Sequence, residues 1–115
     1  AGHAGDQVLR RHHGGVLLLG MGGVGVEIYK DVSLRMAPLK KRDADHMIHE
    51  LVAEKLLTGY RGVEPINMNA LKKAIVNFSR LMMDLQDIVE SVDLNPVMCT
   101  AKACTVVDSR IMLKS

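Results

Sequence analysis

The sequence is poor in aromatic residues and has no long apolar run. Aromatic side chains make up 3% of the 115 residues, and tryptophan is absent. These are too few for the stacking platforms on which single-stranded nucleic acids bind. No apolar run approaches the roughly 18 residues that span a membrane, and the N-terminal residues do not resemble an apolar export signal. We therefore expect no nucleic-acid partner, no membrane partner and a cytoplasmic location.

Cysteine is also scarce, and neither sign of charge dominates. Fifteen basic and 13 acidic residues give a formal net charge of +2, and the basic residues are dispersed. Two cysteines, Cys99 and Cys104, cannot make a disulfide framework. They could bridge to each other, but in a chain without an export signal we expect free thiols. With 48% hydrophobic residues, the chain can form one domain with a modest core.

The N-terminal third contains strand signals after an irregular start. Residues 1–15 are polar and rich in Gly and His, which predicts an irregular segment, either native or left over from expression. Residues 16–115 are expected to form the folded unit. Within it, VLLLG (16–20) reads as a buried strand, and alternation through residues 24–36 predicts further strand.

The glycines of GMGGVG (20–25) match the spacing of the dinucleotide fingerprint G-x-G-x-x-G. That fingerprint needs a helix to begin at the glycines, so that its N-terminus meets the pyrophosphate. Here the following residues are β-branched and alternate between apolar and polar, which favours a strand. We therefore predict a tight glycine connection whose bare backbone can approach a phosphate or a neighbouring loop.

The middle of the chain changes to helical periodicity. Apolar residues recur at helical spacing over residues 41–55, and again over residues 68–84, where Asn67 is a suitable N-cap. His46 and His49 lie three residues apart, whereas the zinc-protease pattern H-E-x-x-H needs them four apart, so we expect surface histidines. The predicted fold class is α+β, a mainly antiparallel sheet covered by two helices.

Residues 92–111 predict a hairpin with a polar face. If its turn is centred between Ala101 and Lys102, antiparallel partners have numbers that sum to 203. Three pairs follow: Cys99 with Cys104, Asn95 with Asp108, and Asp93 with Arg110. Because side chains alternate along a strand, we expect these pairs to share one face, with Leu94, Met98, Val107 and Ile111 on the other.

This polar face suggests a cation site. Directly opposed residues have Cβ atoms roughly 4.5–5.5 Å apart, close enough for one divalent cation between them. The face carries an acid, an amide, a second acid and a guanidinium, and carboxylate and amide oxygens can hold such a cation. A polar, carboxylate-bearing face on a hairpin whose sequence looks buried costs stability unless something binds there.

Several stretches together resemble a known family. They are VLLLGMGGVGVEIYKDVSLRMAPL (16–39), LLTGYRG (56–62), SVDLNPV (91–97) and VVDSRI (106–111). In this order they resemble the C-terminal part of the ATP-grasp domain of NDP-forming acyl-CoA synthetases, the group of ADP-forming acetyl-CoA synthetase and relatives of succinyl-CoA synthetase. The resemblance runs from Val16 to Leu113.

The resemblance implies roles for individual residues. Asp93 and Asn95 form an acid-x-Asn segment that, with Asp108, would hold the Mg²⁺ bridging the phosphates of ATP or ADP. Arg110 would neutralise the transferring phosphoryl group or pair with Asp93, and we favour the ion pair. The secondary candidates, expected on the phosphate side of the site, are Gly22, Gly23 and Glu27.

The resemblance also implies a function for the parent protein. Such enzymes convert an acyl-CoA, phosphate and ADP into the free acid, CoA and ATP through a phosphohistidine relay. The expected partners are the missing ATP-grasp half, which would precede residue 1, and the CoA-binding and phosphohistidine domains. No histidine here matches the phosphorylated one, so the isolated chain should be inactive. The alternatives are a regulatory ATP-grasp-like module, as found fused to protein acetyltransferases, and a structural interaction domain; a homo-oligomer is possible with any of them.

Overall fold

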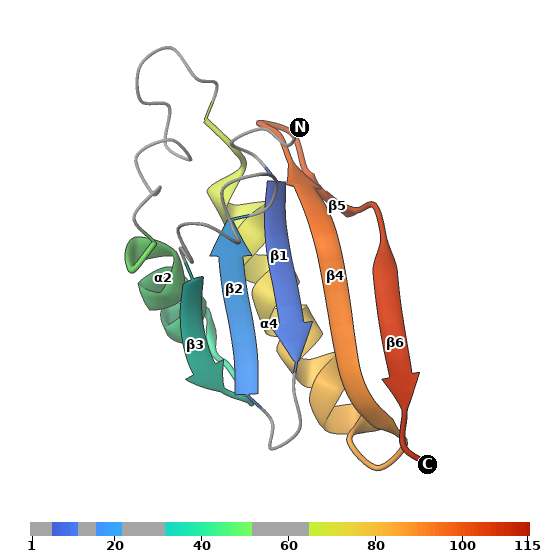
Figure 1. The fold of residues 1–115 in the computed structure, drawn as a ribbon. Helices are drawn as coiled ribbons and strands as arrows, with labels where there is room; N and C mark the ends of the chain where they lie inside the picture. Colours follow the sequence, from blue (N-terminus) through green and yellow to red (C-terminus); the bar gives the residue numbers. More distant parts are fainter. Residues whose placement is uncertain (1–5, 12–15, 22–31, 52–64) are drawn as a thin grey trace.

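The protein folds into two layers, a six-stranded sheet with helices packed on one of its faces (Figure 1). The structure is a computed structural model, and it describes residues 6–11, 16–21, 32–51 and 65–115. Two helices fall within these ranges, and neither is long and apolar enough to cross a membrane. The predicted α+β class, a mainly antiparallel sheet covered by two helices, is confirmed.

Every strand pairing in the sheet is antiparallel. The strands lie in the order β3-β2-β1-β4-β5, and β6 pairs with β4 on the same side as β5. With 11 residues, β4 is long enough to pair with both short strands in turn. The strands are β1 (Asp6–Arg11), β2 (Val16–Met21), β3 (Val32–Met36), β4 (Val89–Cys99), β5 (Cys104–Val106) and β6 (Ser109–Leu113).

The first strand corrects the expectation of an irregular N-terminus. Residues 6–11 form β1, which lies between β2 and β4 and is hydrogen-bonded to both. Only Val8 and Leu9 are apolar in this strand, too short a signal to identify a strand from sequence. Hydrogen bonding to β2 and β4 stabilises this strand, although its own sequence pattern does not predict one. Residues 1–5 and 12–15 lie outside the described residues.

The first helix, α2 (Lys41–His49), ends earlier than the predicted residue 55. Glu50 is its C-cap, and the Leu51 amide donates to the Ile48 carbonyl at 3.1 Å, a tightened last turn of the 3₁₀ type. Leu51 is buried although it lies beyond the helix end. Its apolar side chain therefore fits the helical periodicity without being part of the helix, which made the predicted helix too long. Residues 52–64 lie outside the described part of the chain.

The second helix, α4 (Met68–Leu85), matches the prediction closely. The Asn67 side chain accepts a hydrogen bond from the Ala70 amide at 2.9 Å, which confirms the predicted N-cap. Asn67 also ties the helix to the hairpin turn. Its backbone amide donates to the Thr100 carbonyl at 2.6 Å, and its Nδ2 donates to the Lys102 carbonyl at 3.2 Å.

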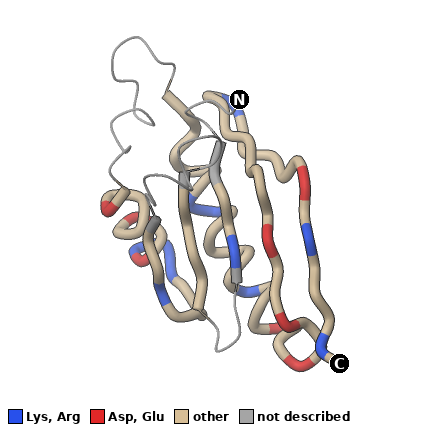
Figure 2. Tube along the Cα trace, in the orientation of Figure 1, with Lys and Arg blue, Asp and Glu red and all other residues tan. Residues whose placement is uncertain are grey.

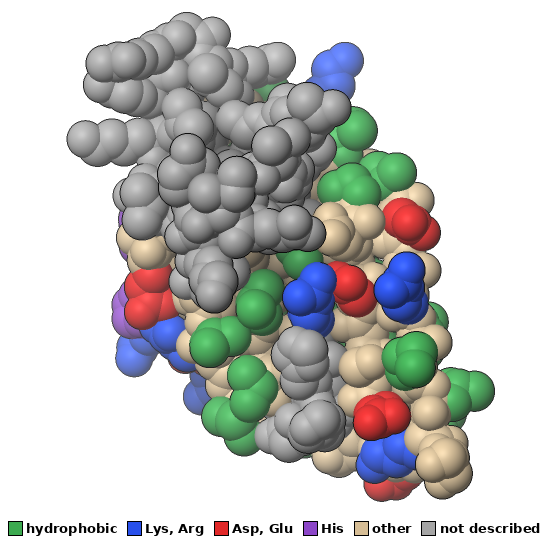
Figure 3. Space-filling view, viewed as in Figure 1, with side chains coloured by type: hydrophobic (Ala, Val, Ile, Leu, Met, Phe, Trp, Pro, Cys, Tyr) green, Lys and Arg blue, Asp and Glu red, His purple; other side chains and the backbone are tan. Residues whose placement is uncertain are grey.

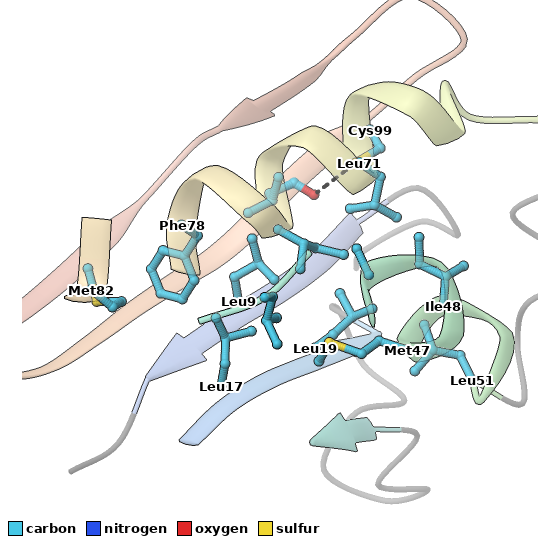
Figure 4. Close-up of a cluster of buried hydrophobic side chains, with 14 of the residues drawn as sticks. Leu9, Leu17, Leu19, Met47, Ile48, Leu51, Leu71, Phe78, Met82 and Cys99 are labelled. Carbon is cyan, nitrogen blue, oxygen red and sulfur yellow. Dashed lines mark hydrogen bonds between the residues drawn. The ribbon is translucent and has the colours of Figure 1, made fainter. Parts of the chain in front are cut away.

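The hydrophobic core lies between the sheet and the helices (Figure 4). Ser79 is fully buried within it, and its hydroxyl accepts from the Leu39 amide at 2.7 Å, so this polar group is satisfied. We call the helix side of the sheet the covered face. Among the most deeply buried side chains are Leu9, Leu17, Leu19, Met47, Ile48, Leu71 and Ile75.

The predicted hairpin register is confirmed. Cys99 pairs with Cys104 and Asp93 with Arg110, as the sum of 203 requires. The second strand is interrupted after Val106 and resumes at Ser109, which separates β5 from β6. Across this break the Asn95 amide donates to the Asp108 carbonyl at 3.1 Å, so these two residues also face each other.

A bulge in β4 corrects the predicted faces. Between the pairs Gln7–Val97 and Leu9–Leu94, β1 advances two residues while β4 advances three. The extra residue in β4 reverses the alternation of its side chains. Cys99 is therefore buried on the covered face and does not share a face with Asp93, contrary to the prediction.

The two cysteines also correct an expectation. Cys99 and Cys104 form a disulfide, whereas we predicted free thiols. The reason is the register, since directly opposed residues here have Cα atoms 4.1 Å apart. The direct opposition of the two cysteines across the hairpin therefore predicts their oxidation state better than the absence of an export signal does.

Candidate functional site

A row of side chains crosses the sheet on the side away from the helices. The strand register places Leu34, Leu18, Arg10, Asp93 and Arg110 next to one another in that order. Leu17 and Leu19 beside Leu18, Leu9 beside Arg10 and Val92 beside Asp93 all belong to the core. The row therefore lies on the opposite side of the sheet, which we call the open face. Figure 2 shows the charged positions of β1, β4 and β6 in line across the sheet.

The charged end of this row opens into a polar pocket of about 270 Å³. Figure 3 shows acidic and basic side chains gathered over β1, β4 and β6, with apolar side chains over β2 and β3 beside them. The prediction that one hairpin face brings the acid, amide, second acid and guanidinium together is therefore confirmed. The pocket is lined by Asp93, Asn95, Asp108, Ser109 and Arg110.

Asp93 has two oxygens in different surroundings. Its Oδ2 lies 3.0 Å from Nη2 of Arg10, and the two side chains are 28% and 36% exposed. Its Oδ1 is buried without a hydrogen-bond partner within the described residues. An unpaired buried carboxylate oxygen costs free energy, and a cation in the pocket would remove that cost.

The other oxygen ligands come from the strand break. Asp108 and Asn95 are exposed, and Oδ1 of Asp108 accepts from the Ser109 amide at 2.8 Å, which orients the carboxylate. Because Asp108 lies between β5 and β6, its backbone can turn the side chain toward β4. The break in the second strand and the bulge in the first thus lie side by side at the pocket.

The donor set fits a hard divalent cation. In the ranges that the structure describes, no three His, Cys, Asp or Glu residues cluster as a metal site. The pocket instead combines two carboxylates with an amide. Mg²⁺ needs only one or two protein oxygens, because it keeps waters and substrate phosphates as its other ligands. The residues present therefore suit Mg²⁺ and do not suit zinc.

Arg10 was missed at the level of sequence, and it changes the role of Arg110. The favoured prediction paired Asp93 with Arg110, but the ion pair that Asp93 makes is with Arg10. Arg110 lines the same pocket from β6. No sequence signal could have found Arg10, because residues 6–11 have only two apolar residues, adjacent to each other, and were interpreted as irregular. Gly22, Gly23 and Glu27 lie outside the described residues.

The two helical histidines lie on the surface, as predicted. His46 and His49 are exposed, and Nε2 of His49 lies 3.5 Å from Oδ2 of Asp45. Asp45 also binds Lys72, with Nζ and Oδ1 2.7 Å apart, and this hydrogen bond is the main cause that lowers the pKa of Asp45. These residues form an ion-pair network between α2 and α4, remote from the pocket on the open face.

Comparison with protein families identifies one match along most of the chain. A family model described as the ATP-grasp domain matches residues 9–113. The chain is 42% identical over 103 residues to the beta subunit of ADP-forming acetate–CoA ligase II from Pyrococcus furiosus, covering 88% of this chain and 44% of that subunit. It is 41% identical over 102 residues to ADP-forming 4-hydroxybutyrate–CoA ligase from Nitrosopumilus maritimus, covering 87% of this chain and 14% of that protein. The chain thus spans less than half the length of these relatives.

Solved structures share the fold. The dinucleotide-forming acetyl-coenzyme A synthetase 1 of Candidatus Korarchaeum cryptofilum, in complex with coenzyme A and Mg-AMPPCP, superposes with a TM-score of 0.88 at 40% identity. The superposition covers 99% of this chain and 55% of that one. The same enzyme with coenzyme A, Ca-AMPCP and HgCl⁺ gives a TM-score of 0.87 at 40% identity, covering 99% and 51%.

Proposed function

This chain belongs to the ATP-grasp domain family, and on that premise we propose that it forms one wall of the nucleotide site of an ADP-forming acyl-CoA synthetase. The relatives named above are ADP-forming CoA ligases, and the chain corresponds to less than half of each. The open face of the sheet would be the wall that meets nucleotide phosphates. The rest of the site would come from the remaining ATP-grasp half of the parent protein.

The pocket on the open face carries this proposal. It gathers two carboxylates and an amide, and Oδ1 of Asp93 has no hydrogen-bond partner within the described residues. We assign Asp93, Asn95 and Asp108 as ligands of a Mg²⁺ ion bound with ATP or ADP. Such an ion would neutralise phosphate charge during phosphoryl transfer.

The neighbouring residues complete the phosphate environment. Arg110 lines the pocket and is not the ion-pair partner of Asp93, so its guanidinium is available for a phosphate oxygen. Its contribution would be electrostatic, made by a positioned cation at the site of developing charge. The three family-derived candidates, Gly22, Gly23 and Glu27, stay predictions for the phosphate side of the site.

The open face also has exposed apolar side chains that another part of a protein could cover. Leu34 and Met36 are 51% and 61% exposed there, beside the charged row. Exposed apolar side chains next to a polar pocket are typical of a surface that another part of a protein covers. We propose that the missing ATP-grasp half packs here and encloses the nucleotide; a homo-oligomer is the alternative occupant.

For the parent protein we propose the conversion of acyl-CoA, phosphate and ADP into the free acid, CoA and ATP. The CoA-binding and phosphohistidine domains would lie elsewhere in that protein, so the isolated chain should show no turnover. A non-catalytic regulatory module and a purely structural domain explain the pocket less well, because neither needs two carboxylates and an amide together.

Binding of ADP to the parent protein, measured by calorimetry with and without Mg²⁺, tests this proposal. Asp108→Asn should remove most of the Mg²⁺-dependent part of ADP affinity, since it removes a charged ligand without changing shape. Asp84→Asn, an exposed acid on α4, is the matched control and should bind as wild type. Unchanged Mg²⁺ dependence in Asp108→Asn, with the fold intact by circular dichroism, would overturn the metal assignment.

A further inference from the structure

Arg10 and Asp93 are cross-strand partners whose ion pair uses only one of the two carboxylate oxygens. Nη2 of Arg10 lies 3.0 Å from Oδ2, and Oδ1 is buried without a hydrogen-bond partner in the part of the chain that is described. The carboxylate therefore has one oxygen committed to a cation of the protein itself. The other oxygen, Oδ1, can still accept a bond from a ligand in the pocket.

The position of Asp93 in the row places an arginine on each neighbouring strand. Arg10 is its partner on β1 and Arg110 is its partner on β6, so the acid lies between two strands that pair with β4 on either side. The contact of Oδ2 with Arg10 is what holds the carboxylate in its orientation. Rotation of the carboxylate to present both oxygens to the pocket would break the contact with Arg10.

The number of oxygens that a carboxylate offers distinguishes Mg²⁺ from Ca²⁺. Mg²⁺ requires a tight octahedron and accepts one oxygen from each carboxylate. Ca²⁺ is larger, takes six to eight ligands and commonly uses both oxygens of an acid. When only one oxygen of an acid is available, Ca²⁺ therefore loses a ligand that it would commonly use, whereas Mg²⁺ loses none.

We propose that Arg10 is a specificity-determining residue, which holds Oδ2 of Asp93, limits this acid to one-oxygen coordination and so makes the pocket prefer Mg²⁺ to Ca²⁺. This inference rests on the proposed function, because it requires a cation in the pocket. Arg10 acts through Asp93 and touches neither metal nor nucleotide. Its guanidinium also sets a limit on the overall affinity, because it places a positive charge near the cation.

The test is the ratio of two affinities. Mn²⁺ bound together with ADP to the parent protein is measured by electron paramagnetic resonance and displaced with Mg²⁺ and, separately, with Ca²⁺. In Arg10→Met the preference for Mg²⁺ over Ca²⁺ should fall by about tenfold, the scale of one charge-assisted contact. Loss of the Arg10 charge affects two divalent ions alike, so it cancels from the ratio.

Two further variants separate specificity from structure. Arg10→Lys keeps a cation that can hold Oδ2, and it should retain most of the preference. Arg35→Met removes an arginine of β3 that pairs with Glu50. It should leave the ratio of Mg²⁺ to Ca²⁺ affinity unchanged. A merely structural role for Arg10 would change stability in Arg10→Met without moving the ratio.

The outcomes distinguish this inference from the proposed function. If Asp93→Asn releases Mn²⁺ but Arg10→Met keeps the wild-type ratio, the metal site stands and the inference about Arg10 is overturned. If Asp93→Asn leaves Mn²⁺ bound with ADP, or the wild-type parent protein binds none, the metal part of the proposed function fails and the inference fails with it.

Discussion

The two faces of the sheet differ in this protein, because one packs in the core and the other carries the candidate site. On the covered face, Leu9 of β1 and Val92 of β4 are 1% and 3% exposed and pack against the helices. On the open face, their immediate neighbours Arg10 and Asp93 form an ion pair beside a polar pocket. A single step along either strand thus passes from the core to the candidate site.

This arrangement separates stability from chemistry. Burial on the covered face supplies the free energy of folding, so the open face can carry an unpaired carboxylate oxygen and exposed apolar side chains. The rigid sheet in turn fixes the spacing of the charged row. Mutations on the two faces should therefore have effects of different kinds.

The largest expected difference lies between two adjacent residues of β1. Leu9→Ala removes a fully buried side chain and should lower the free energy of unfolding by about 2–5 kcal/mol. Arg10→Met removes a partly exposed ion pair but keeps the aliphatic stem, and it should lower the free energy of unfolding by about 1 kcal/mol or less. Urea unfolding of both variants measures the difference, and losses of equal size would show that the two faces are not separate in this way.

A smaller effect is expected where the helix layer is attached to the hairpin. Asn67 caps α4 and also donates to Lys102 in the turn. Asn67→Ala should therefore cost about 1 kcal/mol or somewhat more, measured by urea unfolding. Asn77, exposed on the same helix, is the control, because Asn77→Ala should be neutral or slightly stabilising through helix propensity.

The hairpin illustrates how much of the site could be predicted from sequence. Its register followed from the position of the turn, and pairing alone placed Asp93 opposite Arg110. The cap at Asn67 and the extent of α4 followed from local chemistry in the same way. Such features depend on residues that are close in sequence, which a single sequence displays.

The errors that affect the site involve β1, a strand with two apolar residues that is stabilised by neighbours on both sides. Its register against β4 reveals the bulge that turns Cys99 into the core, and its Arg10 is the partner of Asp93. Neither fact is visible without the long-range pairing. The hairpin pattern predicted the acids of the candidate site, whereas Arg10, the ion-pair partner of Asp93, could not be predicted from it.

The smallest expected effect concerns Glu50, which attaches α2 to β3 on the covered side. Its Oε1 accepts from Nη1 of Arg35 at 2.8 Å and from the Ser33 hydroxyl at 2.6 Å, and these bonds, the one from Arg35 first, lower the pKa of Glu50 below its ordinary 4.5. A carboxylate with a lower pKa in the folded state adds stability above its unfolded-state pKa, and this contribution is lost as the pH falls through the folded-state pKa.

Glu50→Gln should therefore lower the melting temperature at neutral pH, and the gap from wild type should close as the pH falls below 4.5. Asn77→Ala, which removes no titratable group from the exposed surface of α4, should show a gap that stays constant over the same range. Since Glu50 is remote from the pocket, Mn²⁺ binding at neutral pH should stay as in wild type. A Glu50→Gln gap that persists in acid would mean that the side chain stabilises the protein by packing and not by charge, whereas altered Mn²⁺ binding would couple the helix layer to the open face.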